Sequence, residues 1–284
     1  MKTYLLPIWL IAAAAGAAAA QQAPTPATDE EGIRRAALDY MEGALAADAD
    51  RVARGVHEEL NKVVVATLPQ NGPQVLAYNT ATTLVAWARG AAQQLAGVDK
   101  TVEVTVFDVG NDIATARAVG ALWYDLLQLA KVDGRWRIVN VLWAQRQPAA
   151  ESGTAPDASM SEVEATALDY IEGAYSSDAE RMARAIHPEI HKVRLATNPQ
   201  TGESFLHKIG SSSLIEGTRS GLGSLPENER NIEVEIQDVS HGLASVKVTS
   251  AMYIDYVQMA RVNGAWRIIN VLWVPNPDAP GRRG

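Results

Sequence analysis

The chain has 284 residues, which is enough for one or two domains with a sizeable core. Its formal net charge of −8 argues against nucleic acid or an anionic membrane as a partner, because both require a basic surface. It contains no cysteine, which excludes disulfides, thiol catalysis and zinc sites built on thiolates.

Residues 1–20 are typical of a secretory signal peptide. Lys2 supplies a short positive region, Tyr4–Ile11 is apolar, and small residues lead up to a cleavage site after Ala20. The apolar run is short for a membrane span and consists largely of alanine, so we expect it to be removed. The sequence therefore predicts a periplasmic or secreted protein, with residues 21–28 as a disordered lead.

The first part of the mature chain is predicted to form three helices and one strand. Residues 29–46 place apolar side chains at helical spacing and form an amphipathic helix. A short second helix, with Asp48 or Asp50 as its N-cap, runs through RVARGVH and ends at His57. A strand follows in KVVVAT, then the turn PQNG, and a third helix covers approximately Thr80–Leu95.

Four further strands complete the pattern. They are predicted in TVEVTVFDV, IATARAVGALW, DLLQLAKV and RWRIVNVLW. Val132-Asp133-Gly134 joins the last two, because glycine relieves the positive-φ penalty of a tight hairpin. Helices followed by an antiparallel sheet indicate a segregated α+β domain.

The pattern is present twice. Ala37–Ala44 (ALDYMEGA) recurs as Ala167–Ala174 (ALDYIEGA), and the passage Ala130–Trp143 recurs as Ala260–Trp273, each 130 positions later. A period this long indicates a duplicated domain, because solenoid repeats span about 20–50 residues. The predicted organisation is a domain at 29–145, a linker rich in Pro, Ala, Gly and Ser at 146–159, a domain at 160–276 and a disordered tail at 277–284.

The second copy differs in detail. Its short helix is predicted to be capped by Ser177, with Glu180 three residues on, and its third helix covers approximately Ser211–Ser220. The copies diverge most in this third-helix region, where the first offers Trp87 and the second offers SSSLIEGTRSGLG. If the two copies bind different molecules, we expect the difference to lie here.

The start LDYxEGAxxxDxxRxARxxH and the end DxxQxAxVxGxWRIxNVLW resemble the “putative lumazine-binding” group of the NTF2-like (SnoaL-like) superfamily. The resemblance covers most of both copies. It implies an α+β fold, namely two tandem NTF2-like cone-shaped α+β barrels in which helices pack on a curved antiparallel sheet. It also implies that the sheets of two domains pair, so we expect the copies to form an intramolecular pseudo-dimer. A fold does not by itself fix a function.

The closing passage supplies the first candidates for a ligand pocket. Strand alternation predicts that Trp136, Ile138 and Asn140 share one face of the strand, as do their counterparts in the second copy. An asparagine on an apolar face needs a partner, which is either a ligand at the floor of the cone or a nearby loop. Both interpretations stay open. The pocket candidates from this strand are Trp136, Asn140, Trp266 and Asn270.

Tyr40 and Tyr170 lie on the apolar face of the first helix and are also pocket candidates. In ketosteroid isomerase, an enzyme of the same superfamily, a tyrosine in a similar place polarises a substrate carbonyl. The general-base aspartate of that enzyme would fall near Val64 or Val65 here, and near Arg194 or Leu195 in the second copy. None of these side chains can act as that base, so the resemblance does not extend to the isomerase mechanism.

The candidates for acid–base chemistry are His57, His187, Asp125 and Asp255. Each histidine is predicted at the C-terminus of a short helix, where capping by the macrodipole is the alternative explanation. Each aspartate is a pocket acid or an edge residue. HEELN and HPEIH each contain only half of the HExxH motif, so no metal site is predicted, and no cofactor motif is present.

We therefore expect a small, partly apolar molecule to bind in one or both cones without catalysis. Two alternatives stay open. One is an acid–base enzyme, such as an isomerase, cyclase or dehydratase, acting on such a molecule. The other is a protein-interaction module whose cones are filled with side chains. An open cavity would favour binding, and a filled cone would favour the interaction module.

Overall fold

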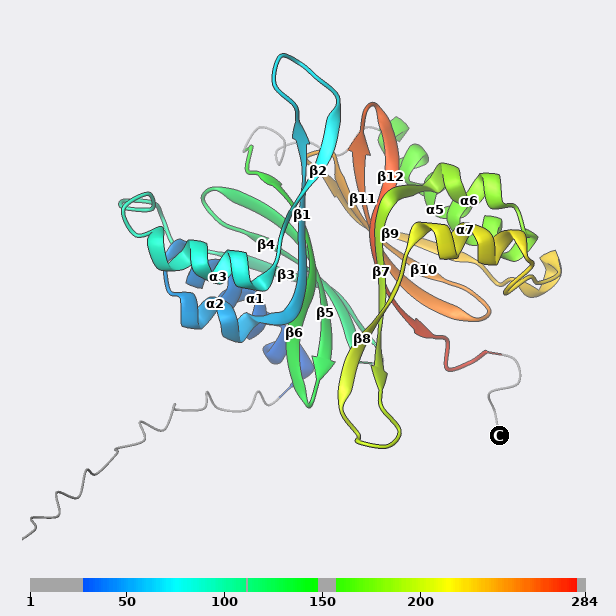
Figure 1. Cartoon of the computed structure of the whole chain (residues 1–284), viewed down its shortest axis with the longest axis horizontal. Helices are drawn as coiled ribbons and strands as arrows, with labels where there is room; N and C mark the ends of the chain where they lie inside the picture. Colours follow the sequence, from blue (N-terminus) through cyan, green and yellow to red (C-terminus); the bar gives the residue numbers. More distant parts are fainter. Residues whose placement is uncertain (1–27, 111, 148–156, 280–284) are drawn as a thin grey trace, which may run out of the picture.

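The computed structural model describes residues 28–110, 112–147 and 157–279. The predicted signal peptide, nearly all of the disordered lead, the centre of the linker and the end of the tail lie outside the described residues. Two domains lie side by side, each with its helices on the outer side and its sheet toward the other domain (Figure 1). No helix within the described ranges is long and apolar enough to cross a membrane.

The first domain contains three helices and six strands in the described residues. In chain order they are α1 (Asp29–Leu45), α2 (Ala49–Gly55), β1 (Val56–Thr67), β2 (Gln74–Asn79), α3 (Ala81–Gly90), β3 (Glu103–Gly110), β4 (Ile113–Val119), β5 (Trp123–Val132) and β6 (Arg135–Gln145).

The second domain repeats this order, with one additional 3-10 turn. Its elements are α5 (Asp157–Ser176), α6 (Ala179–Ala185), β7 (Ile186–Thr197), β8 (Ser204–Ile209), α7 (Ser211–Arg219), η1 (Glu227–Glu229), β9 (Glu233–Ser240), β10 (Leu243–Thr249), β11 (Tyr253–Val262) and β12 (Ala265–Pro275).

Each domain has one six-stranded sheet, and the predicted α+β class is confirmed. The strand order is β2-β1-β6-β5-β4-β3 in the first domain and β8-β7-β12-β11-β10-β9 in the second. The expected all-antiparallel sheet is wrong in one respect, because β1 runs parallel to β6 and β7 runs parallel to β12. The sequence reading also missed the edge strands β2 and β8. The β1–β2 and β7–β8 hairpins project in opposite directions from the centre of the molecule (Figure 1).

Helix starts follow local capping chemistry. Thr28 caps α1 in a capping box with Glu31, and the Asp48 side chain accepts the backbone N–H of Arg51 at the start of α2. In the second domain the cap of α6 is Asp178 and not Ser177. Ser177 instead adopts a positive φ of 59°, which takes it out of the capping position.

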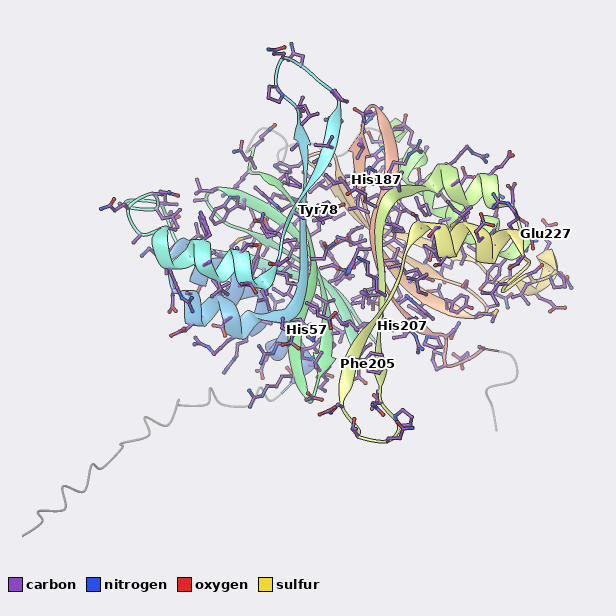
Figure 2. The ribbon with its side chains drawn as sticks, in the orientation of Figure 1. His57, Tyr78, His187, Phe205, His207 and Glu227 are labelled. Atoms are coloured by element: carbon purple, nitrogen blue, oxygen red, sulfur yellow. The ribbon has the colours of Figure 1, made fainter. Side chains whose placement is uncertain are left out.

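The expected helix-terminal position of the two histidines is wrong. α2 ends at Gly55, and His57 is the second residue of β1; His187 has the same place in β7. Their rings do not cap a helix: His57 Nδ1 accepts the N–H of Glu59 at 3.1 Å, and His187 Nδ1 accepts that of Glu189 at 3.1 Å. The two histidines lie in separate domains (Figure 2).

A β-bulge changes which face of the closing strand each residue occupies. Leu129 of β5 pairs with Ile138 of β6, but the preceding Gln128 pairs with Asn140, so Val139 is the extra residue. Ile269 is the equivalent extra residue in β12. The alternation therefore inverts at this point, and the expectation that Asn140 shares a face with the preceding tryptophan is wrong.

The buried apolar residues form two kinds of cluster. Inside each domain, helices cover one face of the sheet, and this helix-covered concave side is the cone of that domain. Between the domains, two further clusters combine residues of both sheets, for example Leu126 with Ile269 and Val139 with Tyr256. One face of each sheet thus belongs to the cone, and the other packs against the second domain.

Candidate functional site

A buried polar cluster lies inside the first cone. Lys62 of β1 reaches Tyr40 of α1, with 2.5 Å from Nζ to the hydroxyl oxygen, and it reaches Oδ2 of Asp125 in β5 at 2.9 Å. The Tyr40 hydroxyl donates to the same carboxylate oxygen. Asp125 is fully buried, and the Lys62 side chain is 9% exposed. The cluster thus joins a helix and two strands on the concave side of the sheet.

The second cone contains the same cluster. Lys192 Nζ lies 2.5 Å from the Tyr170 hydroxyl and forms an ion pair with Asp255, and the Tyr170 hydroxyl donates to Oδ1 of Asp255 at 2.9 Å. The three residues stand 130 positions after their counterparts in the first cone. The cluster is therefore present in both copies, although the copies differ at many other positions.

Burial dominates the ionisation of this cluster. Burial lowers the pKa of Lys62 and Lys192, and the neighbouring aspartate partly offsets that shift. Burial, together with the same aspartate charge, raises the pKa of Tyr40 and Tyr170 well above the usual value, so both phenols are neutral donors at physiological pH.

Each cluster has polar atoms that bond to nothing in the described residues. They are Oδ1 of Asp125 and the indole N–H of Trp143, and in the second cone Oδ2 of Asp255 and the indole N–H of Trp273. Asp125 pairs directly with Trp143 across the two strands, and Asp255 pairs with Trp273. Side chains in such positions lie about 5 Å apart at Cβ, so each cone holds a free acceptor beside a free donor.

The tryptophan of each pair also contacts the lysine. Lys62 Nζ lies 4.6 Å from the ring centroid of Trp143, and Lys192 Nζ lies 4.8 Å from that of Trp273. These distances are within the range of a cation–π interaction. The indole plane is thus held beside the cluster, which fixes the direction of its N–H group.

The aromatic contacts differ between the two cones. In the first domain Trp87 of α3 packs edge to face on Trp123, with 5.8 Å between the ring centroids. In the second domain glycine replaces Trp87, and Tyr253 packs edge to face on Trp273 at 5.2 Å. The guanidinium of Arg194 lies 5.6 Å from the same Trp273 ring. The divergence expected in the third-helix region is thus accompanied by different aromatic neighbours.

The two other predicted pocket tryptophans lie on the cone side but differ in bonding. Trp136 and Trp266 are both buried in the cone clusters. The indole N–H of Trp136 donates to Asp29 at the start of α1, at 3.0 Å. The indole N–H of Trp266 has no hydrogen-bond partner among the described residues.

The asparagines Asn140 and Asn270 lie between the two domains, away from the cones. The side-chain amide of Asn140 donates to Gln128 of its own sheet, and its oxygen lies 2.8 Å from Nδ1 of His191 in the other domain. Asn270 donates likewise to Gln258, and its oxygen accepts from Asn61 of the first domain at 3.0 Å. The bulges at Val139 and Ile269 turn these side chains toward the opposite sheet.

Further polar contacts join the two domains, and they use the equivalent residues Asp108 and Asp238 but tyrosines at positions that are not equivalent. The hydroxyl of Tyr124 donates to Asp238 of the other domain, and that of Tyr256 donates to Asp108. Arg117 lies 3.4 Å from the same Asp238 carboxylate, and Lys247 lies 2.7 Å from Asp108.

The remaining candidates divide between these regions. Asp125 and Asp255 belong to the cone clusters, whereas His57 and His187 each accept a hydrogen bond from a backbone N–H of their own strand. Sequence reasoning missed Lys62 and Lys192. A signal was available, because lysine stands at this position in both copies and is followed at once by a mainly apolar run, VVVA or VRLA. Within the described part of the chain, no three His, Cys, Asp or Glu side chains gather into a metal-binding group.

Comparisons with known proteins agree with the duplication. The family model described as “Putative lumazine-binding” matches residues 28–144 and 158–274. A solved NTF2-like protein of unknown function from Shewanella baltica is 15% identical over 44% of this chain and 99% of its own, with a TM-score of 0.36. An NTF2-like protein of unknown function from Methylobacillus flagellatus is 22% identical over 43% of this chain and 95% of its own, with a TM-score of 0.33.

A third solved structure, titled “Putative Scytalone Dehydratase”, from Novosphingobium aromaticivorans, is 14% identical over 42% of this chain and 84% of its own, with a TM-score of 0.30. Comparison with curated proteins gave no match. The two ranges matched by the family model together cover most of the chain. The chain therefore belongs to the family described as “Putative lumazine-binding”, whose model matches it twice in tandem.

Proposed function

We propose that each domain binds a small, partly apolar molecule in its cone, without catalysis, and that the Tyr–Lys–Asp cluster is its polar anchor. The observation that carries this proposal is the free carboxylate oxygen of Asp125 beside the free indole N–H of Trp143, repeated at Asp255 and Trp273. A buried polar atom without a partner costs about 1–3 kcal/mol. A ligand that presents a donor next to an acceptor satisfies both atoms.

The ligand is expected to be uncharged where it meets the cluster. Lys62 and Asp125 already form an ion pair in a buried site, so a further charge would be desolvated without a counterion. Apolar residues from helices and sheet pack together in the remainder of the cone. These features favour a planar amide, lactam or hydroxyl-bearing ring system as the class of ligand.

An acid–base enzyme is the second candidate. The specific observation in its favour is that Tyr40, Lys62 and Asp125 lie within hydrogen-bond distance of one another, an arrangement that can relay a proton. Conversion of a bound ligand into a product of different mass or proton content would favour this candidate over simple binding.

Native mass spectrometry of the protein purified from its own host tests the leading proposal. We expect a retained small molecule, and a rise in melting temperature with members of a pterin, flavin and steroid panel. The double variant Trp143→Phe/Trp273→Phe keeps an aromatic ring at each position but removes both N–H donors, so ligand affinity should fall about tenfold, which corresponds to about 1.4 kcal/mol. Trp87→Phe is the matched control. A ligand-free mass together with no thermal shift across the panel contradicts the proposal.

We also propose that the domains serve each other as pseudo-dimer partners, and that the protein acts in the periplasm or outside the cell after loss of residues 1–20. The paired contacts of Tyr124 with Asp238 and of Tyr256 with Asp108 support the first proposal. Light scattering should give the mass of a single chain. N-terminal sequencing of the mature protein should begin at Gln21, and an intact Met1 would contradict export with cleavage.

A further inference from the structure

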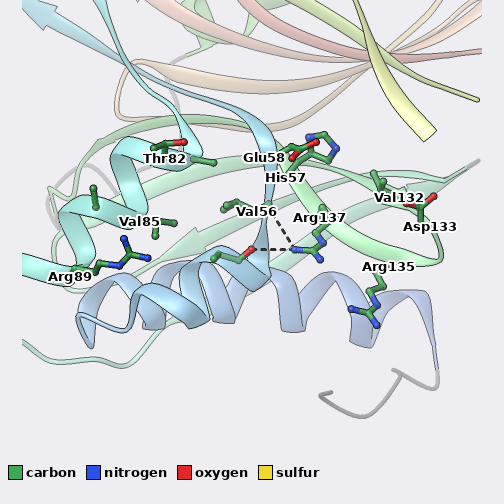
Figure 3. A pocket seen from close by; sticks show the side chains of 13 residues that line it. Val56, His57, Glu58, Thr82, Val85, Arg89, Val132, Asp133, Arg135 and Arg137 are labelled. Carbon is green, nitrogen blue, oxygen red and sulfur yellow. Dashed lines mark hydrogen bonds between the residues drawn. The ribbon is translucent and has the colours of Figure 1, made fainter. Parts of the chain in front are cut away.

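A groove of about 770 Å³ lies on the first domain, away from the polar cluster in its cone. It is bounded by the end of α2, the start of β1, one side of α3 and the β5–β6 hairpin (Figure 3). Its volume is within the range of about 300–1,000 Å³ typical of small-molecule sites. The candidate function described above makes no use of it.

Three arginines line this groove. Arg137 has a structural role, because its guanidinium donates hydrogen bonds to the backbone carbonyls of Ala53, Arg54 and Val56. Arg89 of α3 and Arg135 of β6 form no hydrogen bond or ion pair with any other described residue.

The arginines therefore create unbalanced positive charge. Burial and the nearby charge of Arg135 lower the pKa of Arg137. The effect of Arg135 is a repulsion between like charges within the groove. Two carboxylates, Glu58 and Asp133, also line it, as does His57, but neither carboxylate forms an ion pair with an arginine there. In a chain with a net charge of −8, two unpaired arginines facing one groove are a local exception.

The walls between these charges are apolar. They are formed by small or branched side chains, namely Ala53, Val56, Ala81, Val85, Ala86 and Val132. A site with apolar walls and a few convergent charges suits a molecule with an apolar body and one anionic end. Inorganic anions alone would leave these walls in contact with water.

The second domain has not kept this charge pattern. Ala265 stands in place of Arg135, and Pro188 stands in place of Glu58. Arg219, the counterpart of Arg89, forms an ion pair with Glu216. The unpaired arginines thus belong to the first domain alone, and they are not a requirement of the shared fold.

We propose that this groove is a second ligand site, specific to the first domain, which binds a small organic anion with an apolar body. Arg89 and Arg135 hold the carboxylate or phosphate group by charge-assisted hydrogen bonds, and the apolar wall holds the remainder. The site is separate from the Tyr–Lys–Asp cluster and does not depend on the function proposed for that cluster.

Isothermal titration calorimetry on the full mature chain tests this proposal with four probes: octanoate, octyl phosphate, octanol and inorganic phosphate. We expect the two anionic amphiphiles to bind, with an affinity that falls as salt rises. The stronger of the two identifies the anionic group. Octanol binding as tightly as octanoate, or inorganic phosphate binding as tightly as octyl phosphate, would overturn the proposal, as would the absence of binding by both amphiphiles.

Two single variants locate the site. Arg135→Ala installs the residue of the second domain, and Arg89→Gln removes the other charge; each should weaken binding of the anionic probe at least about tenfold. Arg219→Ala is the matched control in the second domain and should leave affinity unchanged. Both groove arginines are exposed and unpaired, so circular dichroism of the variants should match the parent. Unchanged affinity in both groove variants, or equal loss in Arg219→Ala, refutes the assignment.

Discussion

Replacement of His191 by asparagine should remove a measurable part of the acid sensitivity of this protein. His191 lies in the interface between the domains, where its Nδ1 is 2.8 Å from the side-chain oxygen of Asn140. Burial, reinforced by the positive charge of Lys208, lowers the pKa of His191 from 6.5 to about 4. The folded protein thus favours the neutral imidazole, with its proton assigned to Nδ1 because Asn140 presents an acceptor.

The sign and size of the effect follow from linkage. Because the pKa of His191 is lower in the folded state, its contribution to stability is complete above the unfolded value of 6.5. That contribution is lost progressively as the pH falls toward 4. For these two pKa values the free energy of unfolding drops by about 2 kcal/mol between pH 7 and pH 5, and by about 3 kcal/mol by pH 4.

The substitution is conservative because the first domain already has asparagine at the equivalent position. Asn61 occupies the equivalent position and donates to Asn270 at 3.0 Å, so His191→Asn should form the same bond to Asn140. Urea denaturation followed by tryptophan fluorescence at pH 7 and pH 5 gives the free energy of unfolding of each variant. The loss between the two pH values should be about 2 kcal/mol smaller in His191→Asn than in the parent, whereas the exposed control His207→Asn should behave as the parent.

Other titrating groups, including His57 and His187, are shared by the parent and the variant, so they cancel in this difference. A difference between the two pH responses below about 0.5 kcal/mol would refute the reasoning, since it would mean that the interface accepts the imidazolium ion at little cost. Loss of stability in His191→Asn already at pH 7 would instead show that asparagine cannot make the expected bond at this position.

Two further substitutions test the buried polar contacts by the same denaturation assay. Lys62→Met leaves Asp125 buried without its counterion and should lower the free energy of unfolding by about 3–5 kcal/mol. The exposed control Lys100→Met should have little effect. If the double variant Lys62→Met/Asp125→Leu recovers the stability, the loss is due to the unpaired charge. Tyr124→Phe removes a donor to Asp238 across the interface and should cost about 2 kcal/mol, a value that a change below about 0.5 kcal/mol would contradict.

Much of the architecture could be predicted from the sequence because the duplication makes each signal appear twice. The repeat located both domains, and apolar periodicity located α1, the third-helix region and the long strands. The edge strand β2 was missed because QVLAYN follows a turn and has no clear alternation. The parallel pairing of β1 with β6 joins strands far apart in the chain, and no local pattern encodes such a pairing.

The candidate site was predicted less completely, and the reasons are physical. Tyr40 and Asp125 were identified from their position on apolar elements, but Lys62 was not, since a lysine in a strand normally points to solvent. The face occupied by Asn140 was wrong because a single extra residue, Val139, inverts the alternation. The unpaired charge of Arg135 depends on what lies around it in space, and the sequence alone gave no sign of it.

The joining of both copies in one chain has a consequence for the interface between them. In a dimer of identical chains, every residue near the two-fold axis occurs on both sides, so a histidine could enter only as a pair. Here one side of the interface carries Asn61 and the other carries His191, each bonded to the asparagine of the opposite sheet. A fused chain can thus place a titrating group on one side of a duplicated interface and diversify either half independently, while the tether keeps the halves together at any protein concentration.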